Sequence, residues 1–214
     1  MYRFLLALFA VTLFCACETT NSTTGGMDEQ TEETTEAGGM NTTATTPMPA
    51  ASMSGDNYEV TTTDGSIKSP RKELKGTIDD VAVTINYGSP AVNGRTIYGD
   101  LVPYGKVWRT GANEATRITF DKAVEVGDDD TELAAGTYAL FTIPREGDEW
   151  TVIFNKVSDQ WGAYDYDGAQ DAARVEADVQ QLGSPSERMD FTLGSNSIDL
   201  RWADRMLSFE VEAD

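Results

Sequence analysis

The feature that most constrains the fold of this chain is an alternation of apolar and polar residues with a period of two, which runs from about residue 57 to the end. In VAVTINY, residues 81–87, the side chains of Val81, Val83, Ile85 and Tyr87 recur at every second position. The pattern returns at residues 116–120, 137–143, 149–155, 189–193, 197–202 and 206–212. Because successive side chains of a strand point to opposite faces of a sheet, it predicts half-buried β-strands.

Turn-forming residues separate these segments, among them the Asn-Gly pair at 93–94 and GDDD at 127–130. The nearest approach to a helical pattern is GAQDAARVEADVQQ, residues 168–181, and its apolar stripe is short. Eight to ten short strands in roughly 155 residues predict an all-β fold, an antiparallel β-sandwich with jelly-roll connectivity as one option. The sandwich domain is expected at residues 57–214. Its predicted core residues include Ile118, Phe120, Trp150, Val152, Phe154, Phe191, Leu200, Trp202, Phe209 and Val211.

The first 16 residues have the organisation of a secretory signal peptide. Arg3 precedes an apolar run of about a dozen residues, which is shorter than the ~20 residues that a membrane span needs. The run ends at FCAC, where Ala16 precedes Cys17, and this resembles the lipobox of bacterial lipoproteins, whose cysteine is lipidated after cleavage. An ordinary secretory signal or a short membrane anchor is the alternative. We expect an exported lipoprotein of the cell envelope, anchored in the periplasm or at the outer membrane through Cys17.

Residues 17–56 lack Lys and Arg after the cysteine and are rich in Thr, Gly and Glu. Such a segment cannot bury enough apolar surface to offset its ordering entropy, so it is predicted to be a disordered tether. Both cysteines of the chain, Cys15 and Cys17, precede this tether, so the domain is expected to have no disulfide.

Composition excludes several kinds of chemistry. The chain has no histidine, which rules out Ser-His-Asp catalysis and histidine metal ligation. Its 36 acidic and 16 basic residues give a net charge of −20, which argues against binding nucleic acid. No cofactor is expected, with calcium as the one metal to consider, because its ligands are oxygen atoms.

The densest polar cluster lies in WRTGANEATRITF, residues 108–120, with Arg95 shortly before it. In one interpretation Arg95, Arg109 and Glu114 brace a loop and Asn113 caps a turn. In the other, the two arginines bind a carboxylate, phosphate or sulfate group, because a planar guanidinium suits such anions. Both interpretations stay open at this stage.

Aromatic residues in the loops offer a second kind of site. Tyr and Trp in loops often stack on sugar rings, although they can equally close the ends of a sandwich. The candidates for ligand binding are therefore Arg95, Tyr98, Trp108, Arg109, Asn113, Glu114, Trp161 and Tyr164, with Tyr104 and Tyr166 nearby.

Acidic clusters suggest calcium or catalysis. Asp165, Asp167 and Asp171 resemble an oxygen-rich calcium loop but lack its twelve-residue spacing, and residues 128–132 are most simply a solvated hairpin tip. A glycosidase needs two carboxylates about 5 to 9 Å apart, which Glu114 with Asp165 or Asp171 would supply if their loops converge. A carboxylate-dependent hydrolase centred on Glu114 is therefore the alternative to a binding or structural module for a carbohydrate or small anionic ligand.

Five ordered blocks resemble a bacterial family known as domain of unknown function 2911. They are GRTIYG at 94–99, WRTGANEAT at 108–116, AGTYALFTIP at 135–144, NKVSDQWGAYDY at 155–166 and the closing strands at 200–211. The resemblance extends over about residues 66 to 211. It implies an exported or lipid-anchored β-domain, and it implies no activity.

Overall fold

The computed structural model describes residues 53–214. The predicted signal peptide, Cys17 and most of the predicted tether lie outside these residues. The described strands are β1 Met53–Ser54, β2 Tyr58–Asp64, β3 Arg71–Ile78, β4 Val81–Gly88, β5 Thr116–Phe120, β6 Val124–Val126, β7 Thr131–Leu133, β8 Gly136–Ile143, β9 Glu149–Asn155, β10 Asp171–Leu193 and β11 Ser197–Ala213. A 3-10 helix, η1 Gly168–Gln170, precedes β10.

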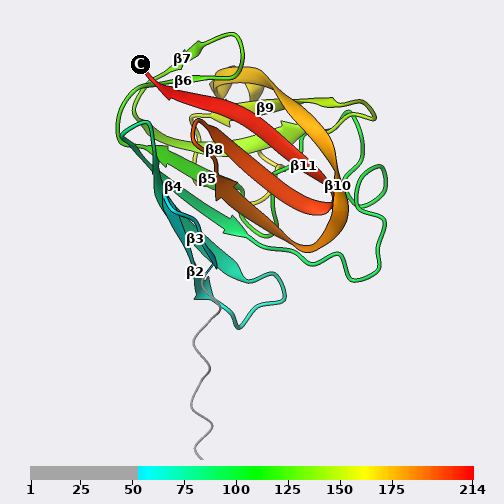
Figure 1. Ribbon diagram of the computed structural model, residues 1–214. Coiled ribbons are helices and arrows are strands. Elements are labelled where there is room, and N and C mark those ends of the chain that lie inside the picture. Colours follow the sequence, from blue (N-terminus) through cyan, green and yellow to red (C-terminus); the bar gives the residue numbers. More distant parts are fainter. Residues whose placement is uncertain (1–52) are drawn as a thin grey trace, which may run out of the picture. The chain divides into compact units, whose positions relative to one another are not determined.

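All eleven strands belong to one antiparallel sheet in the order β1-β2-β3-β4-β5-β8-β9-β10-β11-β6-β7 (Figure 1). The prediction of an antiparallel all-β fold is confirmed. Neighbours in the sheet follow the chain order, except that the β6–β7 hairpin leaves its place between β5 and β8 and pairs with the far edge of β11. This connectivity is a meander with one displaced hairpin, so the jelly-roll option does not describe it.

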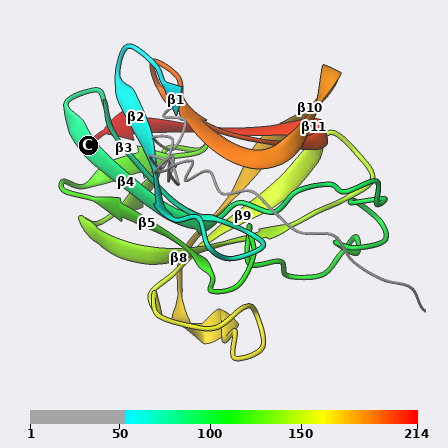
Figure 2. The same cartoon turned by 90° about the horizontal axis from the view of Figure 1, so that it is seen from below.

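The sheet folds over so that the β10–β11 pair faces β3, β4, β5 and β8 across the core (Figure 2). The alternating residues of VAVTINY, TRITF and EWTVIFN are all buried there, as the sequence pattern predicts. Phe191, Leu200, Trp202, Phe209 and Val211 complete the same cluster from β10 and β11. The arrangement is therefore sandwich-like in its packing, although one continuous sheet supplies both layers.

Strands β8 and β9 are buried on both faces. Tyr138 and Leu140 face the main core, whereas Ala139, Phe141 and Ile153 form a second, smaller cluster on the other side. Val107, Ala163 and Tyr166 pack against that second cluster from two loops, residues 89–115 and 156–167. The motif segments around residues 108–116 and 155–166 thus lie side by side on the outer face of the sheet.

Two strands are much longer than the sequence pattern suggests. Strand β10 has 23 residues and β11 has 17, and each absorbs a segment that reads as a turn. Register shifts in β10 lie between Gln181 and Ser186 and between Ser186 and Asp190, and Ala203 in β11 has a φ of 52°. These irregularities bend the pair without ending it, as bulges do. Within residues 53–214, no helix is long and apolar enough to cross a membrane.

Candidate functional site

The chain between β4 and β5, residues 89–115, forms no regular strand and is called the site loop below. Trp108 exchanges both backbone hydrogen bonds with Thr142 of β8, at 2.8 and 2.9 Å. Ala91 forms a bridge with Arg188 of β10. Because the loop is tied to strands of both layers, its side chains are held in fixed positions at one end of the core.

Glu114 serves as a brace between the site loop and the start of β3. Its carboxylate forms an ion pair with Arg71, the first residue of β3. Beside it, Asn113 Nδ2 donates to the carbonyl oxygen of Ser69 at 3.4 Å. The predicted bracing role therefore has a geometric basis for Glu114, with Arg71 as its partner, whereas Asn113, predicted to cap a turn, contacts Ser69.

The two arginines of the cluster differ in their partners. Arg95 donates to backbone carbonyls of its own loop, from Nε to Val92 at 3.0 Å and from Nη2 to Ala91 at 2.5 Å. Among the described residues Arg109 forms no ion pair, with Glu114 or with any other carboxylate. Its guanidinium therefore has no counterion within residues 53–214.

The backbone on the C-terminal side of Arg109 is strained. Thr110 and Asn113 have φ values of 52° and 66°. A β-branched residue such as Thr110 rarely adopts a positive φ, and its side chain is fully buried against Thr142, with Oγ1 to Oγ1 at 3.3 Å. Strain of this kind persists only where the surroundings enforce it, and it concentrates at sites that bind ligands.

A cavity of about 280 Å³ lies between the site loop and the β2–β3 connection. We call it the cationic pocket. Its charged lining residues are Lys68, Arg95 and Arg109, and Asn113 and Trp202 contribute to its wall. None of its described lining residues is Asp or Glu, although the chain carries 36 of them. In a protein of net charge −20, this cavity has a locally positive lining.

Two residues that line the cationic pocket each have a buried donor with no acceptor among the described residues. These donors are Nε of Arg109 and Nε1 of Trp202, whose residue is 1% exposed. A buried donor without an acceptor typically costs about 1–3 kcal/mol, and such groups in native proteins call for an explanation such as a bound water or ion.

A neighbouring cavity of about 300 Å³ shares Trp108 and Arg109 with the cationic pocket and adds Tyr164. Gly162 allows the loop at residues 156–167 to approach the site loop closely here. Its φ is 67°, and a Cβ at this position would lie 3.2 Å from the Tyr164 ring and 3.6 Å from Nη1 of Arg109. Tyr164 is 83% exposed, and Trp161, 57% exposed, lines none of these cavities.

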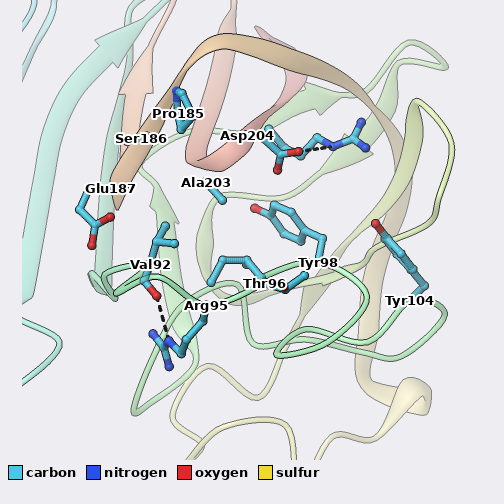
Figure 3. A pocket seen from close by; sticks show the side chains of 12 residues that line it. Val92, Arg95, Thr96, Tyr98, Tyr104, Pro185, Ser186, Glu187, Ala203 and Asp204 are labelled. Carbon is cyan, nitrogen blue, oxygen red and sulfur yellow. Dashed lines mark hydrogen bonds and ion pairs between the residues drawn. The ribbon is translucent and has the colours of Figure 1, made fainter.

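A third cavity, of about 370 Å³, lies on the other side of Arg95, between the site loop and the bent part of β10 and β11 (Figure 3). We call it the tyrosine pocket. Tyr98 and Tyr104 form its aromatic wall, and Asp204 with Arg205 closes the side that β11 supplies. Figure 3 shows the guanidinium of Arg95 turned away from the two tyrosines, toward the Val92 carbonyl.

An aromatic cluster lies behind both pockets. Trp108 stacks on Trp202 with ring centroids 5.8 Å apart, and Tyr98 meets the edges of Trp108, Trp150 and Trp202 at 4.8 to 6.5 Å. Trp108 and Tyr98 are 8% and 9% exposed. These two candidates therefore belong to the core and reach the cavities only with part of their surface.

The acidic candidates are engaged in local structure. Asp171 accepts hydrogen bonds from Tyr166 Oη at 2.7 Å, Arg174 Nε at 2.7 Å and Asn155 Nδ2 at 2.8 Å. Asp167 caps η1. Within the part of the chain that the structure describes, no cluster of three or more acidic or thiol side chains could hold a metal ion. The remaining acidic candidates are exposed, namely Asp128, Asp129, Asp130, Glu132 and Asp165.

The structure thus groups Arg95, Trp108, Arg109 and Asn113 around the cationic pocket and leaves Glu114 outside all three cavities. Sequence reasoning missed Lys68, which carries no signal of its own in the β2–β3 connection. It also missed the contribution of residues 202–205 to the pockets, since Trp202 reads as core and WADR as a turn. The break in alternation at WADR is the one signal that marks this place.

Comparison with known proteins identifies the family of this chain. The family described as "Protein of unknown function (DUF2911)" has a model that matches residues 69–211, more than half of the chain. No curated protein and no solved structure matches. The match spans the site loop and every strand from β3 to nearly the end of β11, which agrees with the five sequence blocks. The chain therefore belongs to the family of proteins of unknown function DUF2911.

Proposed function

We propose that this protein is a lipid-anchored binding module of the cell envelope that takes a small anionic ligand in the cationic pocket. The observation that carries the proposal is the lining of that pocket: Lys68, Arg95 and Arg109, with no carboxylate, in a chain of net charge −20. Glu114, the natural counterion for Arg109, is paired with Arg71 instead. The guanidinium of Arg109 is therefore available to the acceptor oxygens of a ligand.

The chemistry of the pocket favours a carboxylate, sulfate or phosphate group. Every charged group in its lining is a cation, and the amide of Asn113 can add a neutral donor. Hydrogen bonds between charged partners are about twice as strong as neutral ones, and an arginine fork matches two oxygens of one anion. The strained backbone after Arg109 supports a site whose geometry is set before the ligand arrives.

Anion titration tests the proposal. Inorganic phosphate, sulfate and acetate are titrated at low ionic strength, with tryptophan fluorescence as the readout because Trp108 and Trp202 line the pocket. We expect Arg109→Gln to weaken binding roughly tenfold or more, since a hydrogen bond to a charged group contributes about 1.5–3 kcal/mol. The control is Arg117→Gln in β5, which makes the same charge change outside the three cavities. Equal effects of the two substitutions, or no saturable binding, would refute the proposal.

The envelope location rests on the N-terminal sequence. Lipidation at Cys17 is tested by labelling cells that express the protein with radioactive palmitate. We expect Cys17→Ser to abolish the label and Cys15→Ser to retain it. Label that persists in Cys17→Ser and is lost in Cys15→Ser would place the anchor at the other cysteine.

The hydrolase alternative has no observation in its favour. Glu114 is half-buried in its ion pair with Arg71 and lines none of the three cavities. It stays a proposal with a simple test, since a catalytic Glu114 would make Glu114→Gln lose turnover of a glycoside while still binding it.

A further inference from the structure

The tyrosine pocket contains a hydroxyl group whose bonding capacity the protein does not use. Tyr98 is 9% exposed, and among the described residues its Oη has no hydrogen-bond partner. Figure 3 shows this hydroxyl directed into the cavity toward Ala203. The contrast with the other buried tyrosines is clear, because Tyr87 and Tyr138 each donate a hydrogen bond.

The position of this hydroxyl is fixed by the residues around it. Three tryptophan rings contact the Tyr98 ring edge to face, the nearest being Trp150 with centroids 4.8 Å apart. Burial, with the negative charge of Asp204 as the second cause, raises the pKa of Tyr98 above its ordinary value. The group is therefore a neutral hydroxyl that both donates and accepts, held at the base of a cavity.

The remaining lining offers both kinds of hydrogen-bonding group and one aromatic face. Asp204 and Arg205, which form an ion pair at 3.8 Å, supply an acceptor and donors. Glu187, whose Oε1 accepts from Asn93 N, supplies a further acceptor, and Thr96 supplies a hydroxyl. Tyr104 stands beside Tyr98 (Figure 3), and its ring is held against Gly99, whose Cβ would lie 2.9 Å from it. Ligands with several hydroxyl groups need this mixture, because each hydroxyl donates and accepts at once while the C–H face of a sugar ring packs on an aromatic ring.

We propose that the tyrosine pocket is a second binding site, distinct from the cationic pocket, that holds a neutral sugar ring with one hydroxyl bonded to Tyr98. Its volume of about 370 Å³ falls within the usual ~300–1,000 Å³ of small-molecule sites. Its charged lining groups are Glu187 and Asp204 with Arg205, while the guanidinium of Arg95 is turned away from the tyrosines, so an anion is disfavoured here compared with the cationic pocket. The two sites are adjacent, since Arg95 lines both.

The experiment uses glucose, galactose and N-acetylglucosamine as probes, with saturation-transfer NMR and calorimetric titration of the intact protein. The test variant is Tyr98→Phe, which removes one oxygen atom and no protein hydrogen bond. We expect the affinity for the bound sugar to fall roughly fivefold, as for the loss of one neutral hydrogen bond, while the melting temperature stays equal or rises. Tyr104→Ala should also weaken binding, because it removes the other aromatic wall.

A matched control is Tyr138→Phe, which removes a hydroxyl that donates to the Ala134 carbonyl at 2.8 Å, outside the pocket. It should lower the melting temperature and leave sugar binding unchanged. The proposal is overturned if no probe binds, or if Tyr98→Phe binds the sugar as tightly as the parent. The outcome is separable from that of anion binding, because Arg109→Gln, which acts on the cationic pocket, should leave sugar affinity unaltered.

Discussion

Removal of the Asp190 carboxylate should destabilise the fold more than any surface substitution in this chain. Asp190 of β10 is 9% exposed and forms an ion pair with Lys72 of β3. The hydroxyl of Tyr87 in β4 donates to the same oxygen at 3.1 Å. Burial and the charge of Asp190 hold the pKa of Tyr87 above its ordinary value, so the hydroxyl remains a donor. The three side chains join the two layers of the folded sheet.

The magnitude follows from what Asp190→Ala leaves behind. A lysine ammonium and a tyrosine hydroxyl would stay in a nearly dry place with no acceptor, and breaking a buried pair in this way costs about 3–5 kcal/mol. For a domain of this size, each kcal/mol lowers the melting temperature by roughly 2–4 °C. We expect a drop of roughly 6–20 °C in calorimetry and a matching fall in the urea midpoint.

Two controls separate the loss of the buried network from the loss of an ion pair as such. Lys75→Met removes the pair that exposed Lys75 forms with half-buried Glu73, and it should change stability by less than about 1 kcal/mol. The triple variant Lys72→Met, Tyr87→Phe, Asp190→Leu removes every polar member at once and should cost much less than Asp190→Ala, because no charge is left unpaired. If Asp190→Ala costs under about 1 kcal/mol, or if the triple variant is the worse of the two, the network is not the link described here.

Three further outcomes are expected. A Cβ at Gly88 would overlap the backbone carbonyl oxygen of Ala112 in the site loop. Gly88→Ala should therefore lower the melting temperature and also weaken anion binding, which fluorescence titration of the refolded variant checks. Glu125 lies between Glu132 and Glu212 in adjacent strands. Partial desolvation raises its pKa, and repulsion from Asp130 and Asp214 and then from these two glutamates adds to the rise, so Glu125 destabilises the fold as pH rises through its titration. Glu125→Lys should therefore raise the melting temperature and reduce the increase that added salt gives. Burial and the hydrogen bond to Asp171 raise the pKa of Tyr166 to about 12. The stability that Tyr166 contributes should therefore be retained below pH 10, the ordinary tyrosine pKa, and be lost between pH 10 and 12. Tyr166→Phe should show a smaller loss of stability over this range in alkaline unfolding curves.

The strands could be predicted because burial on one face imposes a local, period-two pattern. VAVTINY and TRITF occupy β4 and β5 with the expected faces inward. The long strands β10 and β11 could not be predicted in full, because the Ala203 conformation and the register shifts near Ser186 look like turns in the sequence. The pairing of β6 with β11 joins residues far apart in the chain, and no local pattern encodes a partner at that distance.

The candidate site could likewise be predicted only in part. The cluster at 108–116 was visible as an unusual density of polar residues, and the structure does place Arg95 and Arg109 around one cavity. The partners were not visible. Arg71, Lys68 and Asp204 come from other loops and strands, and only the folded sheet brings them to the site loop.

In the proposed function, Glu114 acts as a brace and Arg109 as part of the anion site. An arginine beside a glutamate in the same loop would normally form an ion pair with it, and the pocket would then keep only Lys68 and Arg95 as unneutralised cations. Here Arg71 takes that role from β3, so Glu114 fixes the loop while Arg109 keeps its charge and an unbonded Nε. Substitution of Arg71 should accordingly act on both properties at once: it loosens the loop, and it frees Glu114 to compete with the ligand for Arg109.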